Sequence, residues 1–137
     1  MFSMWTFPEL DSMRSLRDNF TFCRDYYRWT GYRSNLPNAG CRSKEDTSLL
    51  FSYSFDEPVM TFDPVSTGNA GWEEFLAAYN ALCSQHGGRP LFNQTGWLTW
   101  AQSGEAFGDR LKTFEGYRQR FDPTERLLNE DFSKLLQ

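Results

Sequence analysis

Only a few short stretches of this sequence have the character of β-strands, and they lie among longer helical patterns. Two of them, Thr47–Phe55 and Val59–Asp63, are rich in aromatic and β-branched residues, and Asp56-Glu57-Pro58 separates them. Turn residues between two such runs favour an antiparallel hairpin. Two or three strands make a thin sheet, so helices must cover it. The sequence therefore predicts an α+β fold, with helices packed on a small antiparallel sheet.

The first helix is predicted from apolar residues that recur at steps of three and four. It opens at Pro8-Glu9, or with Ser12 as its cap, and ends near Trp29, before Gly31. The positions expected to face the core are Met13, Leu16, Phe20, Cys23 and Tyr27. The pattern thus favours an amphipathic helix with an aromatic buried face.

A second helix is predicted after the hairpin. Asn69 is the expected cap, and Gly87-Gly88 ends the helix. Its apolar positions are Trp72, Phe75, Leu76, Tyr79, Leu82 and Cys83. The segment Arg89–Thr95 is then expected to run extended.

Two more helices are predicted towards the end of the sequence. One starts at Ser103 and carries Phe107, Leu111, Phe114 and Tyr117 on one face. The sequence FDPTER interrupts it, because Asp122 is suited to a cap and Pro123 to a first helical turn. The order of elements is therefore helix, hairpin, helix, short strand and two helices.

Size and charge exclude several classes of protein. A chain of 137 residues suits one domain, and its net charge of −4 with no basic stripe argues against nucleic-acid binding. No apolar run is long enough to span a membrane, and the N-terminus lacks the features of a signal peptide. A protein expressed as this chain alone would be cytoplasmic.

The aromatic content is unusually high for a chain of low overall hydrophobicity. Phe, Trp and Tyr make up 18% of the residues, with 13 Phe, while the hydrophobic fraction is 39%. Aromatic rings fill cores, line pockets for flat ligands, or form a surface for another domain. The sequence leaves these three uses open.

The residues with catalytic or metal-binding chemistry are few. Cys23, Cys41 and Cys83 have no metal-site spacing, and reduced thiols are favoured over the single disulfide that three cysteines allow. The only histidine, His86, is expected in the last turn of a helix, where a cation suits the helix dipole. No zinc site and no nucleophile–base pair is predicted.

The remaining candidate site is the segment Arg89–Thr95, RPLFNQT. Asn93 and Gln94 do not titrate, but each offers two donors and one acceptor that can orient a ligand or stabilise a developing negative charge. Leu91 and Phe92 would form an apolar wall beside them. The alternative is a loop or edge strand whose amides satisfy backbone groups, and residue types alone favour that alternative.

Three stretches of the second half resemble the C-terminal part of flavin-linked oxidases of the vanillyl-alcohol oxidase superfamily. They are GGRPLFNQT at 87–95, AFGDRLKTF at 106–114 and RFDPTERLLNEDFSKLL at 120–136. The ending Asp-Pro-x-x-Arg-Leu-Leu-Asn-x-x-Phe, here Asp122 to Phe132, is typical of the superfamily rather than of one substrate.

The nearest resemblance is to the substrate-binding domain of the cholesterol oxidase type with covalently held FAD. FCRDYYRWTG, DEPVMTFDPVSTG, WEEFLAAYN and GGRPLFNQT carry it, and together with the ending they cover essentially the whole chain. Sugar-lactone oxidases are a second, weaker resemblance through Gly-Gly-Arg-Pro and the Asp-Pro-x-x-Arg ending. Those enzymes have His, Trp and Lys where this sequence has Leu91, Phe92 and Gln94.

The resemblance implies that the chain shapes the substrate pocket of an FAD-dependent alcohol oxidase acting on sterol-type substrates. It implies that Asn93 is the active-site amide beside the flavin. Arg89, Leu91, Phe92 and Gln94 would line the substrate and flavin pocket.

The cholesterol oxidase type also has a carboxylate–arginine pair near its substrate entrance. The matching strand is expected around Ser52 and Ser54, where this sequence has serines, and Glu9 is an alternative acidic contributor. The sequence therefore departs from the pattern at this pair.

The same family carries FAD mainly on an N-terminal domain with its own phosphate-binding loop, and this sequence has no such loop. The resemblance implies that residues 1–100 belong to the substrate-binding domain and that 101–137 are C-terminal helices packing on an FAD-binding domain or subunit. The apolar start of the chain also suggests an absent partner. We therefore expect a C-terminal fragment that is inactive alone, and the alternative is a non-catalytic remnant or interaction module.

Overall fold

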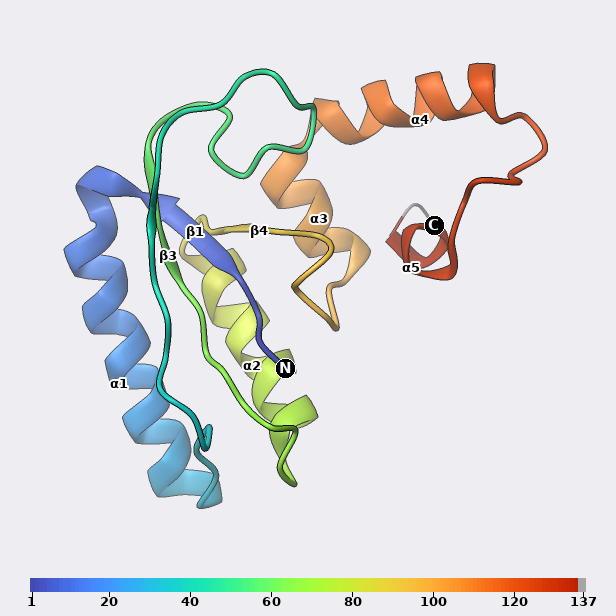
Figure 1. Ribbon diagram of the computed structural model, residues 1–137. Helices are drawn as coiled ribbons and strands as arrows, with labels where there is room; N and C mark the ends of the chain where they lie inside the picture. The colour runs from blue at the N-terminus through green and yellow to red at the C-terminus, as the bar shows by residue number, and fades with distance from the viewer. Residues whose placement is uncertain (136–137) are drawn as a thin grey trace.

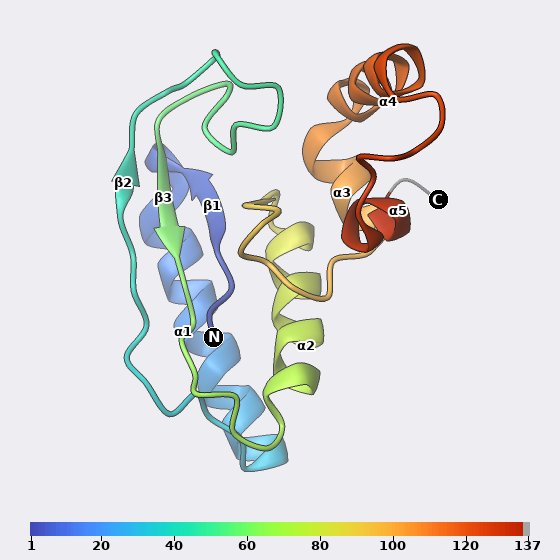
Figure 2. The same cartoon turned by 45° about the vertical axis from the view of Figure 1, so that its right-hand side comes forward.

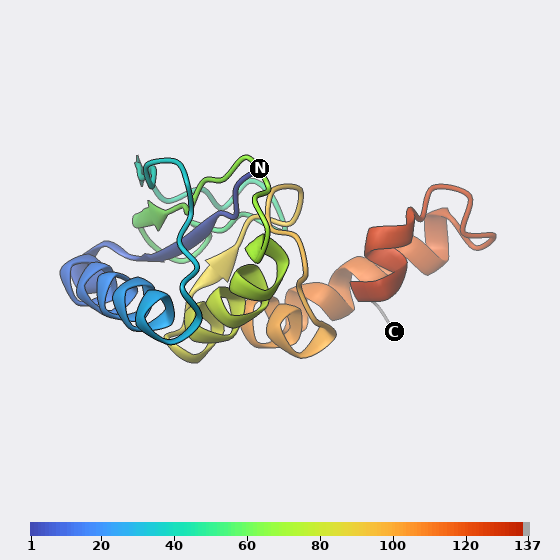
Figure 3. The same ribbon diagram turned by 90° about the horizontal axis from the view of Figure 1, so that it is seen from below.

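The computed structural model describes residues 1–135 and has the predicted α+β architecture (Figure 1). Its elements are β1 (Trp5–Pro8), a 3-10 turn (Glu9–Asp11), α1 (Ser12–Thr30), β2 (Arg42–Ser43), β3 (Val59–Phe62), α2 (Trp72–Gln85), β4 (Arg89–Pro90), α3 (Trp100–Phe107), α4 (Asp109–Phe121) and α5 (Glu130–Leu135). The four strands form one antiparallel sheet in the order β2-β3-β1-β4. Helices α1 and α2 lie on one face of it (Figure 3).

The apolar start of the chain is an inner strand of this sheet. β1 pairs with β3, with Trp5 opposite Phe62 and Thr6 opposite Thr61, and it pairs with β4 on its other side. Trp5 and Phe7 point towards the helices and are buried in the core. The N-terminal stretch, which suggested an absent partner, therefore finds its partners within the protein.

The other face of the sheet is covered by the connection between β2 and β3. Because strand residues alternate between faces, Thr6 points away from the helices. Its hydroxyl lies 3.3 Å from the carbonyl oxygen of Tyr53 and 3.1 Å from that of Arg89. The residues before β3 thus lie across the sheet, and Figure 2 shows this connection looping over the ends of β1 and β3.

The predicted hairpin is wrong in its first half. Val59–Phe62 is a strand, but 47–55 is a series of turns rather than a strand. Local hydrogen bonds account for this: Asp46 accepts from the backbone and hydroxyl of Ser48, and Ser52 donates its backbone N–H to the carbonyl of Leu49. Such side-chain and turn bonds compete with strand pairing.

The predicted buried face of α1 is wrong for most of its residues, although the helix ends as expected at Gly31 in the left-handed region (φ 76°). Met13 and Phe20 are 70% and 62% exposed, and Tyr27 is exposed as well, whereas Cys23 packs against the core as predicted. The other side chains that face the core are Ser15, Asn19, Phe22 and Tyr26. Two of these core-facing residues, Ser15 and Asn19, are polar, so a search for apolar periodicity does not find this face of the helix.

Asn19, one of these polar residues, links α1 to α2 and to the sheet through hydrogen bonds. Asn19 donates to the hydroxyl of Tyr79 (2.6 Å), which in turn donates to the carbonyl of Phe62 (2.8 Å). Tyr79 is fully buried and stacks on Phe75. The chain of two bonds satisfies polar groups that would otherwise be costly to bury.

The second helix has the expected extent and buried face, but its cap differs. Gly71, with φ 92°, occupies the position before Trp72. Asn69 instead accepts hydrogen bonds on its side-chain oxygen from Tyr32 and Ser66. A β-carbon at Gly71 would lie 2.8 Å from the Tyr32 ring, so the close approach of these two segments requires glycine.

The predicted helix from Ser103 is two helices. α3 begins earlier, where Thr99 and Gln102 form a reciprocal capping box, and Gly108 (φ 49°) separates it from α4. Phe107 and Leu111 are buried as predicted, whereas Tyr117 is 56% exposed.

The last helix starts later than predicted. Asp122 accepts the backbone N–H groups of Arg126 and Leu127, both at 2.8 Å, and so stabilises a turn rather than a helix. Asn129 caps α5 by accepting from the N–H of Phe132. Figure 3 shows α4 and α5 extending to one side of the sheet and its two covering helices.

Candidate functional site

Only Arg89 and Pro90 of the segment predicted to run extended form a strand, and the residues after them form a short turn. One residue of the N-terminal strand region holds this turn at both ends. The Leu91 N–H and the Thr95 hydroxyl both donate to the carbonyl of Met4, at 3.1 and 2.7 Å. The Gln94 N–H donates to the carbonyl of Leu91 (2.9 Å) and closes the turn. These bonds leave Asn93 at the apex of an anchored turn.

The exit of this turn is held by a buried asparagine of α2. Asn80 is fully buried and donates to the carbonyl of Gly96 at 2.8 Å. Its side-chain oxygen accepts from the indole N–H of Trp5 (2.9 Å) and from the hydroxyl of Ser3 (3.5 Å). One core side chain therefore joins the turn to α2 and to β1.

The predicted site residues have different environments. Asn93 is exposed, whereas Leu91 and Phe92 are half-buried. The side-chain oxygen of Gln94 is buried and has no hydrogen-bond partner. An acceptor buried without a partner is costly, so this oxygen lowers the stability of the turn rather than contributing to its exposed surface.

Phe92 belongs to a group of aromatic rings that connects the turn to the C-terminal helices. Its ring centroid lies 4.5 Å from Phe107, 5.1 Å from Phe51 and 5.6 Å from Phe132. Phe114 completes the group through Phe51, at 5.1 Å. Phe92 therefore fixes the turn against α3 and α5, and Leu91 is the other member of the predicted apolar wall.

Arg89 is the fifth predicted residue, and it belongs to a charged cluster behind the turn. Its guanidinium lies 2.5 Å from a carboxylate oxygen of Asp56. Arg110 of α4 lies 4.0 Å from the same oxygen. This cluster could not be predicted from the sequence, because its three residues are far apart in the chain and meet only in the folded protein.

Ser52 and Ser54, which stand where the resemblance leads us to expect a carboxylate–arginine pair, are buried, and their hydroxyls lie 3.3 Å apart and bond each other. Glu9, the alternative acidic contributor, forms a bidentate pair with Arg42 at 2.6 and 2.8 Å. Glu9 and Arg42 are both substantially exposed, so this pair is a surface contact.

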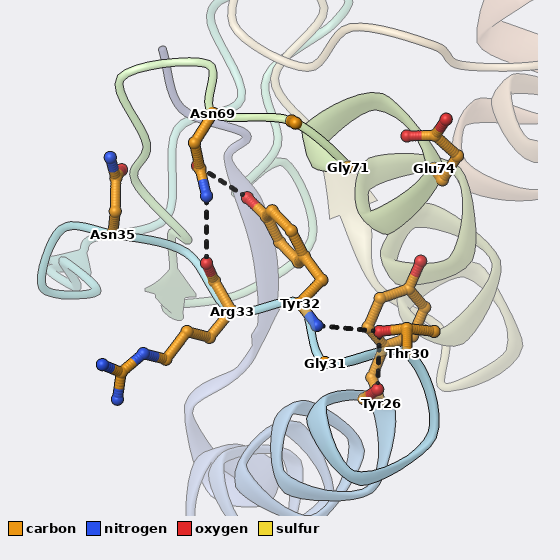
Figure 4. Close-up of a pocket in the computed structure, with 10 residues that line it drawn as sticks. Tyr26, Thr30, Gly31, Tyr32, Arg33, Asn35, Asn69, Gly71 and Glu74 are labelled. Atoms are coloured by element: carbon orange, nitrogen blue, oxygen red, sulfur yellow. Dashed lines mark hydrogen bonds between the residues drawn. The ribbon is translucent and has the colours of Figure 1, made fainter.

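A cavity of about 540 Å³ lies elsewhere, at the end of α1 and the start of α2 (Figure 4). Tyr32 donates to Asn69 there at 3.1 Å, and burial raises the pKa of the Tyr32 phenol. The 14 residues of α2 span about 21 Å and separate this cavity from β4. The cavity is therefore distinct from the turn that carries Asn93.

A second cavity, of about 530 Å³, lies between α1 and α2 and includes the histidine. His86 is the residue that follows α2, as predicted, and its Nδ1 lies 3.2 Å from a carboxylate oxygen of Asp18. All three cysteines are free, and burial raises the pKa of the Cys23 thiol to about 11. Burial likewise raises the pKa of Cys83, so both thiols are protonated and unreactive at neutral pH.

One buried carboxyl group lies in the sheet. Asp63 accepts from the hydroxyl of Thr61 (2.9 Å), but its second oxygen is buried without a partner. Burial raises the pKa of Asp63 to about 6, although hydrogen bonds from Thr61 and from the Trp5 backbone act in the opposite direction. The folded state thus holds the proton more tightly than the unfolded chain, whose ordinary value is 3.8.

We expect Asp63→Asn to stabilise the protein at neutral pH by about 3 kcal/mol, which corresponds to the shift of the pKa. The free energy of unfolding of the wild-type protein, compared with that of the variant, is highest below about pH 4. It falls as the pH rises from about 4 to 6, and it stays constant at higher pH. Urea unfolding of both proteins at pH 4 and pH 7.5 checks this. Equal effects of the substitution at the two pH values would contradict it.

No family model matches the chain, and no curated protein matches it. Within residues 1–135, no group of three or more His, Cys, Asp or Glu side chains is arranged to hold a metal ion. In the same part of the chain, no helix combines the length and apolar character needed to cross a membrane. The site is therefore defined by its own geometry: an exposed amide on an anchored turn, with an aromatic group and an arginine cluster behind it.

Proposed function

We propose that this chain forms the substrate-side part of an FAD-dependent alcohol oxidase of the sterol type, acting with an FAD-binding domain or subunit. The observation that carries the proposal is the position of Asn93. Its amide is exposed at the apex of a turn that is anchored on Met4 and Asn80. An exposed amide on an anchored turn suits contact with a group supplied by another domain.

The residues around the turn fit the edge of a flavin ring, which carries hydrogen-bond donors and acceptors on a flat, largely apolar body. Asn93 is exposed and offers two donors and one acceptor. Leu91 supplies an apolar side chain next to them. FAD, when bound, would accept a hydride from the carbinol carbon and pass the electrons to O2, giving hydrogen peroxide.

The roles of the chain's own residues follow from their contacts. Asn93 would orient the substrate hydroxyl or the flavin edge, because an uncharged amide positions a group without exchanging protons. Phe92 would hold the turn against the aromatic group. Arg89 is engaged with Asp56, so it would contribute positive charge behind the turn rather than direct contact.

The test is to produce this chain together with an FAD-binding domain of the family and to purify the assembly. We expect flavin to copurify, and we expect hydrogen peroxide to be released when a sterol or another secondary alcohol is supplied. The chain alone serves as the control and should release none. An assembly that holds flavin but oxidises none of the alcohols contradicts the proposal.

The same experiment separates two competing functions. A sugar-lactone oxidase domain would release peroxide with aldonolactones and not with sterols. A non-catalytic interaction module would bind the second domain without any turnover. The exposed apolar residues Leu10, Met13 and Trp29 are the observation that favours an interaction role.

A further inference from the structure

Two arginines from distant parts of the chain converge on a single carboxylate. Arg89 comes from β4 and Arg110 from α4, and both approach the same oxygen of Asp56, at 2.5 and 4.0 Å. Figure 1 shows that the connection between β2 and β3, which carries Asp56 in the sequence, extends towards the junction of α3 and α4. The cluster carries two positive charges and one negative charge, in a chain whose net charge is −4.

Arg110 is largely covered but poorly bonded. Its side chain is 17% exposed, and its hydrogen bonds to the carbonyls of Ser52 and Ala106 are long, at 3.4 and 3.5 Å. A guanidinium has five donors, and a buried charge normally requires close partners. Most of the hydrogen-bonding capacity of Arg110 is therefore unused.

Aromatic rings, rather than hydrogen bonds, hold Arg110 in place. Its guanidinium carbon lies 4.6 Å from the ring centroid of Phe55 and 5.3 Å from that of Phe107. Contacts of this kind fix the plane of the group and leave its edge free to bind an anion. Burial lowers the pKa of Arg110, the charge of Asp56 opposes this shift, and the charge of Arg89 adds to it.

Exposure differs between the acid and the two bases. The Asp56 side chain is 51% exposed, whereas those of Arg89 and Arg110 are 25% and 17% exposed. The Asp56 carboxylate is therefore the most solvent-exposed of the three charged groups, which favours its displacement by another anion.

We propose that Arg89 and Arg110 form a binding site for a small oxyanion, a carboxylate or phosphate group of a ligand, and that Asp56 occupies this site as an internal competitor. An oxyanion placed between the two guanidiniums can accept hydrogen bonds from both, whereas the Asp56 oxygen lies 4.0 Å from Arg110, beyond hydrogen-bond distance. This inference concerns residues of the chain itself and does not rest on the oxidase assignment.

The test is a titration of the purified protein with sodium phosphate and, separately, with sodium acetate, while chloride keeps the ionic strength constant. The NMR signals of the Arg89 and Arg110 side chains and of the Asp56 amide are followed. We expect saturable shifts with a dissociation constant on the order of millimolar. Saturation by phosphate alone indicates a phosphate-bearing ligand, and saturation by acetate indicates a carboxylate. Shifts that chloride reproduces, or that do not saturate with either anion, would overturn the proposal.

Variants give the sharper result, because they change the affinity in opposite directions. Asp56→Asn should strengthen binding roughly tenfold, since it removes the competitor, and Arg110→Gln should weaken it roughly tenfold or more. Asp11→Asn and Arg14→Gln make the same changes of charge at exposed positions of the N-terminal region and should leave the affinity unchanged. If Arg110→Gln does not fold, Arg110→Lys and the gain from Asp56→Asn decide the matter. Unchanged affinity in Asp56→Asn contradicts the role of Asp56.

Discussion

Asn93→Ala is expected to lower the rate of alcohol oxidation by the flavin-loaded assembly roughly 10²–10³-fold, because an orienting or charge-stabilising donor is lost. The residue is exposed at the apex of its turn, and none of the bonds that anchor the turn involves its side chain. The substitution should therefore leave the fold intact. The measurement is the peroxide release rate under saturating alcohol, with the flavin content of each preparation determined from its absorbance.

A matched control for this effect is Asn38→Ala, which removes another exposed asparagine amide, in the segment before β2. Its rate should equal that of the unmodified assembly. Asn93→Gln retains the amide on a longer side chain and should recover part of the rate if hydrogen bonding is the cause. Full activity in Asn93→Ala would show that the amide has no part in the reaction.

Asn80→Ala is expected to destabilise the protein by roughly 2–4 kcal/mol, because it removes a fully buried amide that two groups share as a partner, one of them buried. These are the indole N–H of Trp5 and the carbonyl of Gly96, which Asn80 bonds at 2.9 and 2.8 Å. The loss is a large fraction of the stability of a typical domain. Urea unfolding followed by tryptophan fluorescence measures it.

The same variant should also loosen the turn that carries Asn93, since Asn80 holds its exit. Amide hydrogen exchange of residues 91–96 is expected to become faster, and that of α1 to remain slow at low denaturant. Asn38→Ala, an amide removed from an exposed site, is the stability control and should change the free energy of unfolding very little. A loss below about 1 kcal/mol in Asn80→Ala would mean that other groups replace its bonds.

Most helices could be predicted because their signals are local. Gly31 ends α1 and Gly87 follows α2, each with positive φ, as the sequence indicated. The prediction was wrong where local hydrogen bonds compete with the strand pairing that a residue pattern favours. The alternating residues of 47–55 read as a strand, but the turn bonds of Asp46 and Ser52 keep that segment irregular.

The buried face of α1 could not be predicted from apolar periodicity. Phe20 and Phe22 are the same type of residue, yet Phe20 is exposed while Phe22 contacts the core rings of α2. The deciding partner is Tyr79, which bonds Asn19 and is far away in the sequence. A polar residue on the buried side of a helix is recognised only when its partner is known.

The candidate site, too, could be predicted only in part from the sequence. The sequence drew attention to Asn93 and its neighbours, because a run of Pro, apolar residues and amides after two glycines is unusual. It did not reveal Asp56 and Arg110, which meet Arg89 only through the packing of three separate segments. Nor did it reveal that Asn80 holds the turn.

The sequence by itself determined the α+β class and the order of the helices, because caps, glycines and hydrophobic periodicity act within a few residues. Only the tertiary structure decided which strands pair, which side of α1 is buried and which charges converge behind the turn. Those outcomes depend on contacts between residues distant in the chain, such as Trp5 with Asn80 and Arg89 with Asp56. Their free energy comes from burial and from the satisfaction of buried polar groups, and neither is written in a local pattern.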